Sequence, residues 1–148
     1  MILVDTNILL RIADGANPDS AHARNAVLKL HRAGRTLHMV PQNLYEFWAV
    51  ATRPTGAFSS ANGLGMSPSR ADLWLGYLYR NFVLLPDKPE LSEQWRNLVT
   101  IFGVTGKKSH DVRLVAAMKT HNVADLLTFN IQDFKKFASI TVINPRTV

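Results

Sequence analysis

The stretch MILVDTN, residues 1–7, decides the fold class, because a short apolar run there gives way abruptly to three polar residues. Its apolar part, residues 2–4, contains β-branched side chains and no charge, which is typical of a buried strand. Its polar part, Asp5-Thr6-Asn7, consists of residues that favour a turn or a helix cap, so the strand should end there. A strand buried on both sides belongs in a parallel sheet that helices cover on both faces.

Outward from this stretch, the patterns predict that helices and strands alternate along the chain. Apolar residues at helical spacing and Pro or Gly stop signals predict helices over residues 20–32, 41–53, 68–80, 89–102, 109–121 and 131–137. Short apolar runs predict further strands over residues 36–40, 82–85, 125–129 and 140–143. Residues 55–69 are rich in Gly, Ser, Ala and Asn and are expected to form a long loop or a mobile clamp. The alternation predicts an α/β fold with a mainly parallel sheet.

Length and composition limit the organisation of the chain. Its 148 residues fit one domain, residues 1–148, and we expect no second one. The absence of cysteine excludes disulfides and thiolate metal sites. No apolar run approaches the roughly 18 residues of a membrane span, and no signal peptide is recognisable. We therefore expect a cytoplasmic protein that does not bind membranes.

The charge balance points toward a polyanionic partner. Lys and Arg number 17 against 11 Asp and Glu, which gives a formal net charge of +6. A basic domain without membrane features commonly binds nucleic acid. The basic residues are scattered rather than gathered in a tail, however, so the charge alone does not identify the partner.

Four of the scarce acids follow predicted strands or begin predicted helices. Asp5 follows the first strand, Glu46 and Asp111 lie in the early turns of two helices, and Asp133 comes after the strand at 125–129. Ligands of parallel sheets bind at the carboxyl ends of the strands, where these four side chains could converge. Clustered carboxylates repel one another, and a hard cation such as Mg²⁺ relieves that repulsion. The acids therefore indicate a cation site, and the basic surroundings a phosphate-bearing substrate.

Each of these acids taken alone has an ordinary structural explanation. Asp5 could only cap a turn, Asp111 could only favour the helix dipole, and Asp133 could only cap or solvate a short helix. Glu46 is harder to explain in this way, because its sequence neighbours are mostly apolar. The coincidence of four acids in four segments favours a site.

These segments resemble a known family. The segments VDTN (4–7), PQNLYEF (41–47), HDVRLVA (110–116) and LTFNIQDF (127–134) resemble the four acidic blocks of PIN-domain ribonucleases. The whole chain is similar to VapC-type toxins of bacterial or archaeal toxin–antitoxin pairs. The resemblance implies a three-layer α/β/α fold and a Mg²⁺-dependent endoribonuclease, with Mn²⁺ as a substitute, that leaves a 5′-phosphate and a 3′-hydroxyl.

The resemblance also implies roles for individual residues. Asp5, Glu46 and Asp111 match the three central acids of the family as metal ligands and catalytic groups. We expect Asp133 to be the fourth acid and Asn130 a neutral ligand, although either residue could fill the fourth position. Supporting side chains around the metal would be Thr6, Asn7 and Thr128. Candidates for contact with the RNA backbone are Arg11, Arg53, Lys107, Lys108 and Arg113.

Partners follow from the same resemblance. We expect an RNA substrate, a cognate VapB-type antitoxin and a homodimer, with the helix at 68–80 as a groove for the antitoxin tail or as a dimer face. Three alternatives remain: a PIN-like nuclease of RNA processing without an antitoxin, a catalytically silent RNA-binding module, and a phosphatase with a nucleophilic Asp after the first strand. The phosphatase reading is disfavoured because Asn7 stands where that class usually has a second Asp. The sequence does not say which RNA is cut.

Overall fold

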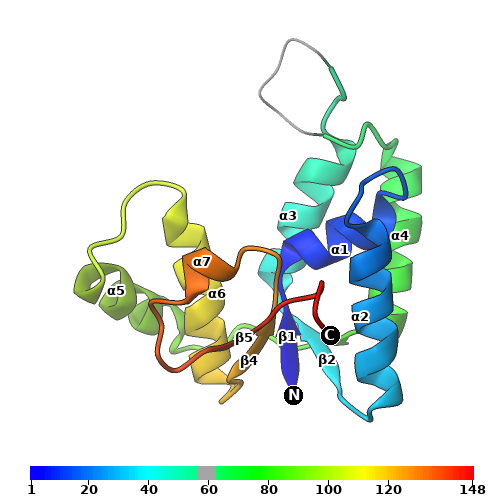
Figure 1. Ribbon diagram of the computed structural model, residues 1–148. Coiled ribbons are helices and arrows are strands. Elements are labelled where there is room, and N and C mark those ends of the chain that lie inside the picture. Colours follow the sequence, from blue (N-terminus) through cyan, green and yellow to red (C-terminus); the bar gives the residue numbers. More distant parts are fainter. Residues whose placement is uncertain (57–62) are drawn as a thin grey trace.

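The computed structural model describes residues 1–56 and 63–148, and in these residues five strands form one parallel sheet (Figure 1). The strand order is β3-β2-β1-β4-β5, with β1 in the centre. The strands are β1 Ile2–Val4, β2 Leu37–Met39, β3 Val83–Leu84, β4 Asp125–Leu127 and β5 Thr141–Ile143. The predicted parallel sheet is confirmed.

Helices cover both faces of the sheet, as Figure 1 shows. Ile2 and Val4 of β1 pack into one hydrophobic cluster, and Leu3 between them packs into another on the opposite face. The first cluster includes α1 Thr6–Ala13, α2 Ser20–Arg32, α3 Pro41–Thr52 and α4 Pro68–Asn81, and the second α5 Leu91–Ile101, α6 Lys108–Thr120 and α7 Ile131–Phe134. The three-layer α/β/α architecture is thus confirmed. None of the helices in this part of the chain is long and apolar enough to cross a membrane.

Several helix boundaries differ from the sequence prediction, and two of the differences lie next to the predicted acids. The first polar stretch is more than a turn: α1 begins at Thr6, directly after Asp5, and its apolar side is buried in the core. The prediction that residues 109–111 cap a helix is wrong, because α6 begins at Lys108 and these residues lie inside its first turn. The cause is Gly106, whose positive φ of 61° closes a turn that lets the helix start earlier. Asp111 remains in the first turn, as expected.

The order of the strands predicts where a ligand binds at the sheet. From β1 the chain adds β2 and then β3 on one side, and it crosses to the other side to form β4 and β5. The order therefore reverses between β1 and β4, and parallel α/β sheets bind ligands outside the strand ends at such a point. The Asp5 backbone N–H donates to the Leu127 carbonyl at 2.9 Å, which fixes Asp5 beside the end of β4.

The segment after α3 folds back over the end of that helix. The backbone N–H groups of Leu64 and Met66 donate to the Val50 and Ala51 carbonyls at 3.1 and 2.8 Å. A Cβ on Gly63 would lie 2.0 Å from the Arg53 carbonyl oxygen, so this close return requires glycine. Part of the loop or clamp predicted at 55–69 thus caps the end of α3. At its other end, α4 already begins at Pro68, and residues 57–62 lie outside the described residues.

We expect His38 to make the fold sensitive to acid. This side chain in β2 is 5% exposed, and its Nδ1 has no hydrogen-bond partner in the described structure. Burial lowers the pKa of His38 below 6.5. As the pH falls below about 6.5, the unfolded chain takes up a proton that the folded chain does not, so stability decreases. We expect His38→Leu to reduce this loss in urea unfolding across a pH series. His22→Leu, on the exposed side of α2, is the control, and a pH profile unchanged in His38→Leu would contradict the prediction.

Candidate active site

The carboxylate of Asp5 is held by side chains from α1 and from the segment after β4. The Thr128 hydroxyl donates to Asp5 Oδ2 at 2.6 Å, and the Asn7 amide Nδ2 donates to the same oxygen at 2.9 Å. Thr128 is fully buried, and its hydroxyl also accepts from the Asn7 amide at 3.1 Å and from the Asn130 backbone N–H at 3.0 Å. The Phe129 backbone N–H in turn donates to Asn7 Oδ1 at 3.3 Å. Asp5 is therefore fixed in orientation by contacts between the ends of β1 and β4.

Glu46 is held at both of its carboxylate oxygens. The Thr6 hydroxyl donates to Oε2 at 2.7 Å, and the Gln42 amide donates to Oε1 at 2.7 Å. The fully buried Asn43 amide donates to the Thr6 hydroxyl at 3.1 Å and to the Val4 carbonyl at 3.2 Å. These contacts connect α3 to the end of β1 and bring Glu46 toward Asp5.

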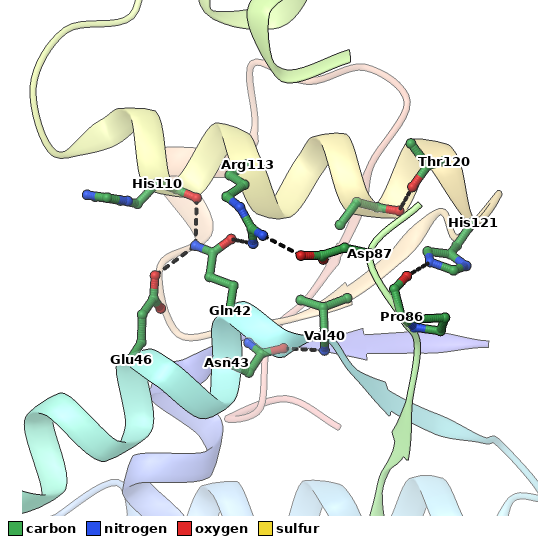
Figure 2. Close-up of polar contacts among 11 residues, drawn as sticks. Val40, Gln42, Asn43, Glu46, Pro86, Asp87, His110, Arg113, Thr120 and His121 are labelled. Atoms are coloured by element: carbon green, nitrogen blue, oxygen red, sulfur yellow. Dashed lines mark hydrogen bonds and ion pairs between the residues drawn. The ribbon is translucent and has the colours of Figure 1, made fainter. Parts of the chain in front are cut away.

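Gln42 links α3 to α6, as Figure 2 shows. Its Nε2 donates to Glu46 Oε1 and, at 2.9 Å, to the His110 backbone carbonyl, while the His110 imidazole points away. Its Oε1 accepts from Arg113 at 3.0 Å, and Arg113 also donates to Asp87 Oδ2 at 2.7 Å. Because Arg113 is a pure donor, it fixes which end of the Gln42 amide faces Glu46.

Asp111 and Asp133 complete the acidic group. Asp111 lies in the first turn of α6, where burial and the charges of Asp133 and Glu46 raise its pKa. Asp133 lies on α7 and forms an ion pair with Lys108 at 3.4 Å. The two acids are thus close enough to repel each other across the gap between α6 and α7.

Among the acids of this group, Asp5 has the most strongly raised pKa. Burial raises its pKa to about 6, the charges of Asp111 and Glu46 add to this effect, and the hydrogen bond from Thr128 opposes it. Asp5 is thus affected by the charges of Glu46 and Asp111, and Asp111 by those of Glu46 and Asp133, so repulsion links the four acids at the switch point of the sheet. A cation at this place would relieve the repulsion.

The acidic group fits a sparsely ligated hard cation better than a complete protein cage. Within residues 1–56 and 63–148, no three His, Cys, Asp or Glu side chains are placed to hold one ion together. Mg²⁺ needs only one or two carboxylates, because it keeps several waters and accepts phosphate oxygens as further ligands. The donor set, all carboxylate and amide oxygens, suits such an ion.

The other predicted site residues differ in whether they contact the four acids. Asn130 is exposed and contributes its backbone N–H to Thr128. Of the basic candidates, Lys108 pairs with Asp133, and Arg113 is engaged by Gln42 and Asp87. Lys107 is exposed one residue before α6. No hydrogen bond or ion pair between described residues joins Arg11 or Arg53 to the four acids.

Sequence reasoning missed the polar residues behind the acids, which are Gln42, Asn43 and Asp87. A signal existed for one of them, since Gln42 and Glu46 are four residues apart and so share one helix face. The contacts of Gln42 with His110 and Arg113 carry no such signal, because they span 68 and 71 residues.

Replacing Thr128 tests whether its hydroxyl organises Asp5. Thr128→Val keeps the shape but leaves Asp5, Asn7 and Asn130 without this partner, so we expect a loss of about 2–3 kcal/mol in the free energy of unfolding. Thr128→Ser keeps the hydroxyl and should retain most of that stability. Urea unfolding of the two variants measures the difference, and equal losses would show that the methyl group rather than the hydroxyl matters.

Comparisons with known proteins agree with this geometry. A model of the PIN domain family matches residues 2–140. No curated protein sequence matches the chain.

Several solved structures are similar in fold over nearly their whole length. VapBC2 from Rickettsia felis, bound to a DNA fragment from its promoter, has a TM-score of 0.68 and 17% identity, covering 97% of this chain and 98% of that one. A toxin–antitoxin complex from Klebsiella pneumoniae has a TM-score of 0.66 and 16% identity, covering 98% of both chains. VapC20 from Mycobacterium tuberculosis, a toxin that cleaves the sarcin–ricin loop, has a TM-score of 0.64 and 12% identity, covering 91% of this chain and 95% of that one.

At such identities the structural likeness concerns the fold, and the family model carries the assignment. That model spans the four segments that bring Asp5, Glu46, Asp111 and Asp133 to one edge of the sheet. By sequence and by fold, the chain belongs to the PIN domain family.

Proposed function

We propose that this chain is a metal-dependent endoribonuclease that acts as the toxin of a toxin–antitoxin pair. The observation that carries the proposal is the gathering of four acids at the switch point of a PIN-domain sheet, where neighbouring carboxylates help to raise the pKa of Asp5 and Asp111. A binding module without catalysis would gain nothing from a partly buried Asp5 whose pKa is raised to about 6. The excess of basic residues suits an RNA substrate.

Mg²⁺ or Mn²⁺ would be held by one or two carboxylates of the group formed by Asp5, Asp111, Glu46 and Asp133, with Asn130 as a neutral candidate and water as the remaining ligands. Such an ion, when bound, lowers the pKa of a coordinated water and offsets charge on the phosphoryl oxygens. Thr128 and Asn7 hold Asp5 in one orientation, and Thr6 and Gln42 do the same for Glu46. Asp111, whose pKa is raised, is the carboxylate that we assign to accept the proton of the attacking water.

Cleavage of RNA by the purified protein tests the proposal. Total RNA is incubated with Mg²⁺, with Mn²⁺ or with EDTA, and the new ends are mapped by sequencing. We expect cutting with either metal, none with EDTA, and 5′-phosphate ends at a small number of sites in unpaired loops. Failure of the folded, metal-loaded protein to cut total RNA would favour a silent binding module.

The toxin assignment is supported by the similarity in fold to chains solved as toxin–antitoxin complexes. The exposed face of α4 is the surface that we propose for the antitoxin or for a second copy of the chain. Leu73 there is 74% exposed, and Trp74 and Tyr77 lie edge to face beside it, with centroids 5.4 Å apart. Expression should arrest growth, and co-expression of a small neighbouring reading frame should relieve the arrest. Cutting without growth arrest would instead favour a nuclease of RNA processing.

A further inference from the structure

A cavity of about 480 Å³ lies between α5 and the start of α6, outside the acidic group. Its volume falls within the range of roughly 300–1,000 Å³ that is usual for small-molecule sites. Pro89, Leu91 and Trp95 give it a mainly apolar wall, and Ser92 and Ser109 add polar atoms. The cavity is therefore large and apolar enough for a flat aromatic ring.

Trp95 is fixed in place within this wall. Its indole N–H donates to the Ser109 backbone carbonyl at 2.9 Å, which ties α5 to the first turn of α6. The side chain is only partly buried, so part of it remains available to a ligand. An anchored indole stacks on a base at little cost in conformational entropy.

The charges around the cavity match a nucleotide. Lys88 gives its edge a positive charge, Arg113 lines it while pairing with Asp87 at 2.7 Å, and the lining residues, all from the described part of the chain, include no carboxylate. This contrasts with the acidic group nearby. An apolar wall with an aromatic ring and cationic edges is the combination that binds an unstacked base together with its phosphate.

The cavity lies beside the acidic group, with Gln42 between them. His110 and Arg113, which line it, are the two residues that contact Gln42, and Gln42 contacts Glu46 (Figure 2). One side chain thus separates the cavity from the acidic group. A ligand in the cavity would lie next to whatever phosphodiester the acids hold.

We propose that this cavity binds an unpaired nucleobase of the RNA, beside the phosphodiester presented to the acids. The inference rests on the proposed ribonuclease function and adds a structural reason why the protein would select unpaired RNA. A paired base cannot enter a cavity between two helices, so the subsite selects single-stranded loops.

Binding measurements in the absence of cutting test the subsite. All proteins carry Asp5→Asn and are kept in EDTA, and the probes are a labelled single-stranded oligoribonucleotide and the duplex of the same sequence. Fluorescence anisotropy should show that Trp95→Leu weakens single-strand binding by about tenfold, the scale of one lost stacking contact. Trp95→Phe should keep most of the affinity, and duplex binding should change little in either variant.

Two further variants separate a lost subsite from a damaged fold. Ser92→Trp fills the cavity from an exposed position without touching the Trp95–Ser109 hydrogen bond, and it should weaken single-strand binding similarly. Asn97→Trp, at another exposed position of α5 that does not line the cavity, is the matched control and should bind normally. Unchanged affinity in both Trp95→Leu and Ser92→Trp, or no single-strand binding by the parent protein, overturns the proposal.

Two further outcomes distinguish a failure of the subsite proposal from a failure of the ribonuclease proposal. If the two cavity variants bind RNA normally but no longer bind the antitoxin, the cavity belongs to the protein partner and the proposal is wrong. If they lose RNA binding while the protein with intact Asp5 cuts no RNA, the subsite stands and the ribonuclease proposal fails.

Discussion

Asp5→Asn is expected to abolish RNA cleavage and, at the same time, to make the metal-free protein more stable at neutral pH. Loss of a direct metal ligand should lower the rate by more than the roughly 100-fold upper range seen for outer-shell partners. The gain in stability follows from the pKa of Asp5, which burial raises to about 6 in the folded protein from its ordinary value of 3.8. Asparagine can still accept from Thr128 and Asn7 through its Oδ1.

The direction of the pH dependence follows from proton binding. Between about pH 4 and 6 the folded protein keeps a proton on Asp5 that the unfolded chain has released, so the folded state binds more protons. The free energy of unfolding therefore falls as the pH rises through this window. At pH 7 the ionised Asp5 costs about 2–3 kcal/mol, which the asparagine variant does not incur.

Unfolding by urea at pH 4 to 8, with EDTA and then with Mg²⁺, measures both effects. The stability of the wild type should fall with pH relative to that of Asp5→Asn in EDTA, and Mg²⁺ should restore it only in the wild type. Asp72→Asn removes an exposed acid on α4 and serves as the matched control. Equal stability of Asp5→Asn and wild type at pH 7 would contradict the raised pKa of Asp5, and normal cutting by the variant would move the active site elsewhere.

Gln42→Ala should have the second largest effect, because it removes the side chain that connects α3 and α6. Glu46 loses the donor to Oε1, and Arg113 loses the acceptor that Gln42 supplies. We expect a 10- to 100-fold fall in cleavage rate, the usual range for partners of metal ligands. We also expect the variant to require more Mg²⁺, because Glu46 is less well oriented.

Gln42→Glu tests whether the site needs the hydrogen-bond donor of Gln42 or only the shape of its side chain. The new carboxylate keeps an acceptor for Arg113 but faces Glu46 Oε1 and the His110 carbonyl, both of which need a donor. Its activity should therefore be no better than that of Gln42→Ala, despite its nearly identical shape. Cleavage rates over a range of Mg²⁺ concentrations measure both variants, and Gln94→Ala on α5 is the control. A Mg²⁺ requirement that is unchanged in Gln42→Ala would contradict the positioning role.

The sequence was sufficient to predict the features with local causes. Apolar residues 2–4 followed by Asp5 predicted a buried central strand with a polar group at its carboxyl end, and the structure has both. The same argument predicted that Glu46 and Asp111 begin helices at that edge. Their carboxylates are near Asp5 because all the strands are parallel, a property of the topology that the alternation of elements already indicated.

What the sequence could not predict depends on contacts between distant segments. Thr128 was expected only to support the site, yet its hydroxyl connects Asp5, Asn7 and Asn130. The start of α6 was misplaced because the turn at Gly106 precedes the polar residues that usually mark a cap. Asp87 had no local signal, since its partner Arg113 lies 26 residues away.

The hydrogen bond between Thr128 and Asp5 joins residues that are 123 positions apart in the chain. During synthesis, Asp5 leaves the ribosome long before β4, which is among the last strands to be made. The hydrogen bond to Thr128 forms only after that strand has been made. Contacts of such long range form late in folding and slow it. A nascent chain that still lacks β4 has no assembled acidic edge, so we expect it to lack the proposed nuclease activity until its synthesis is nearly complete.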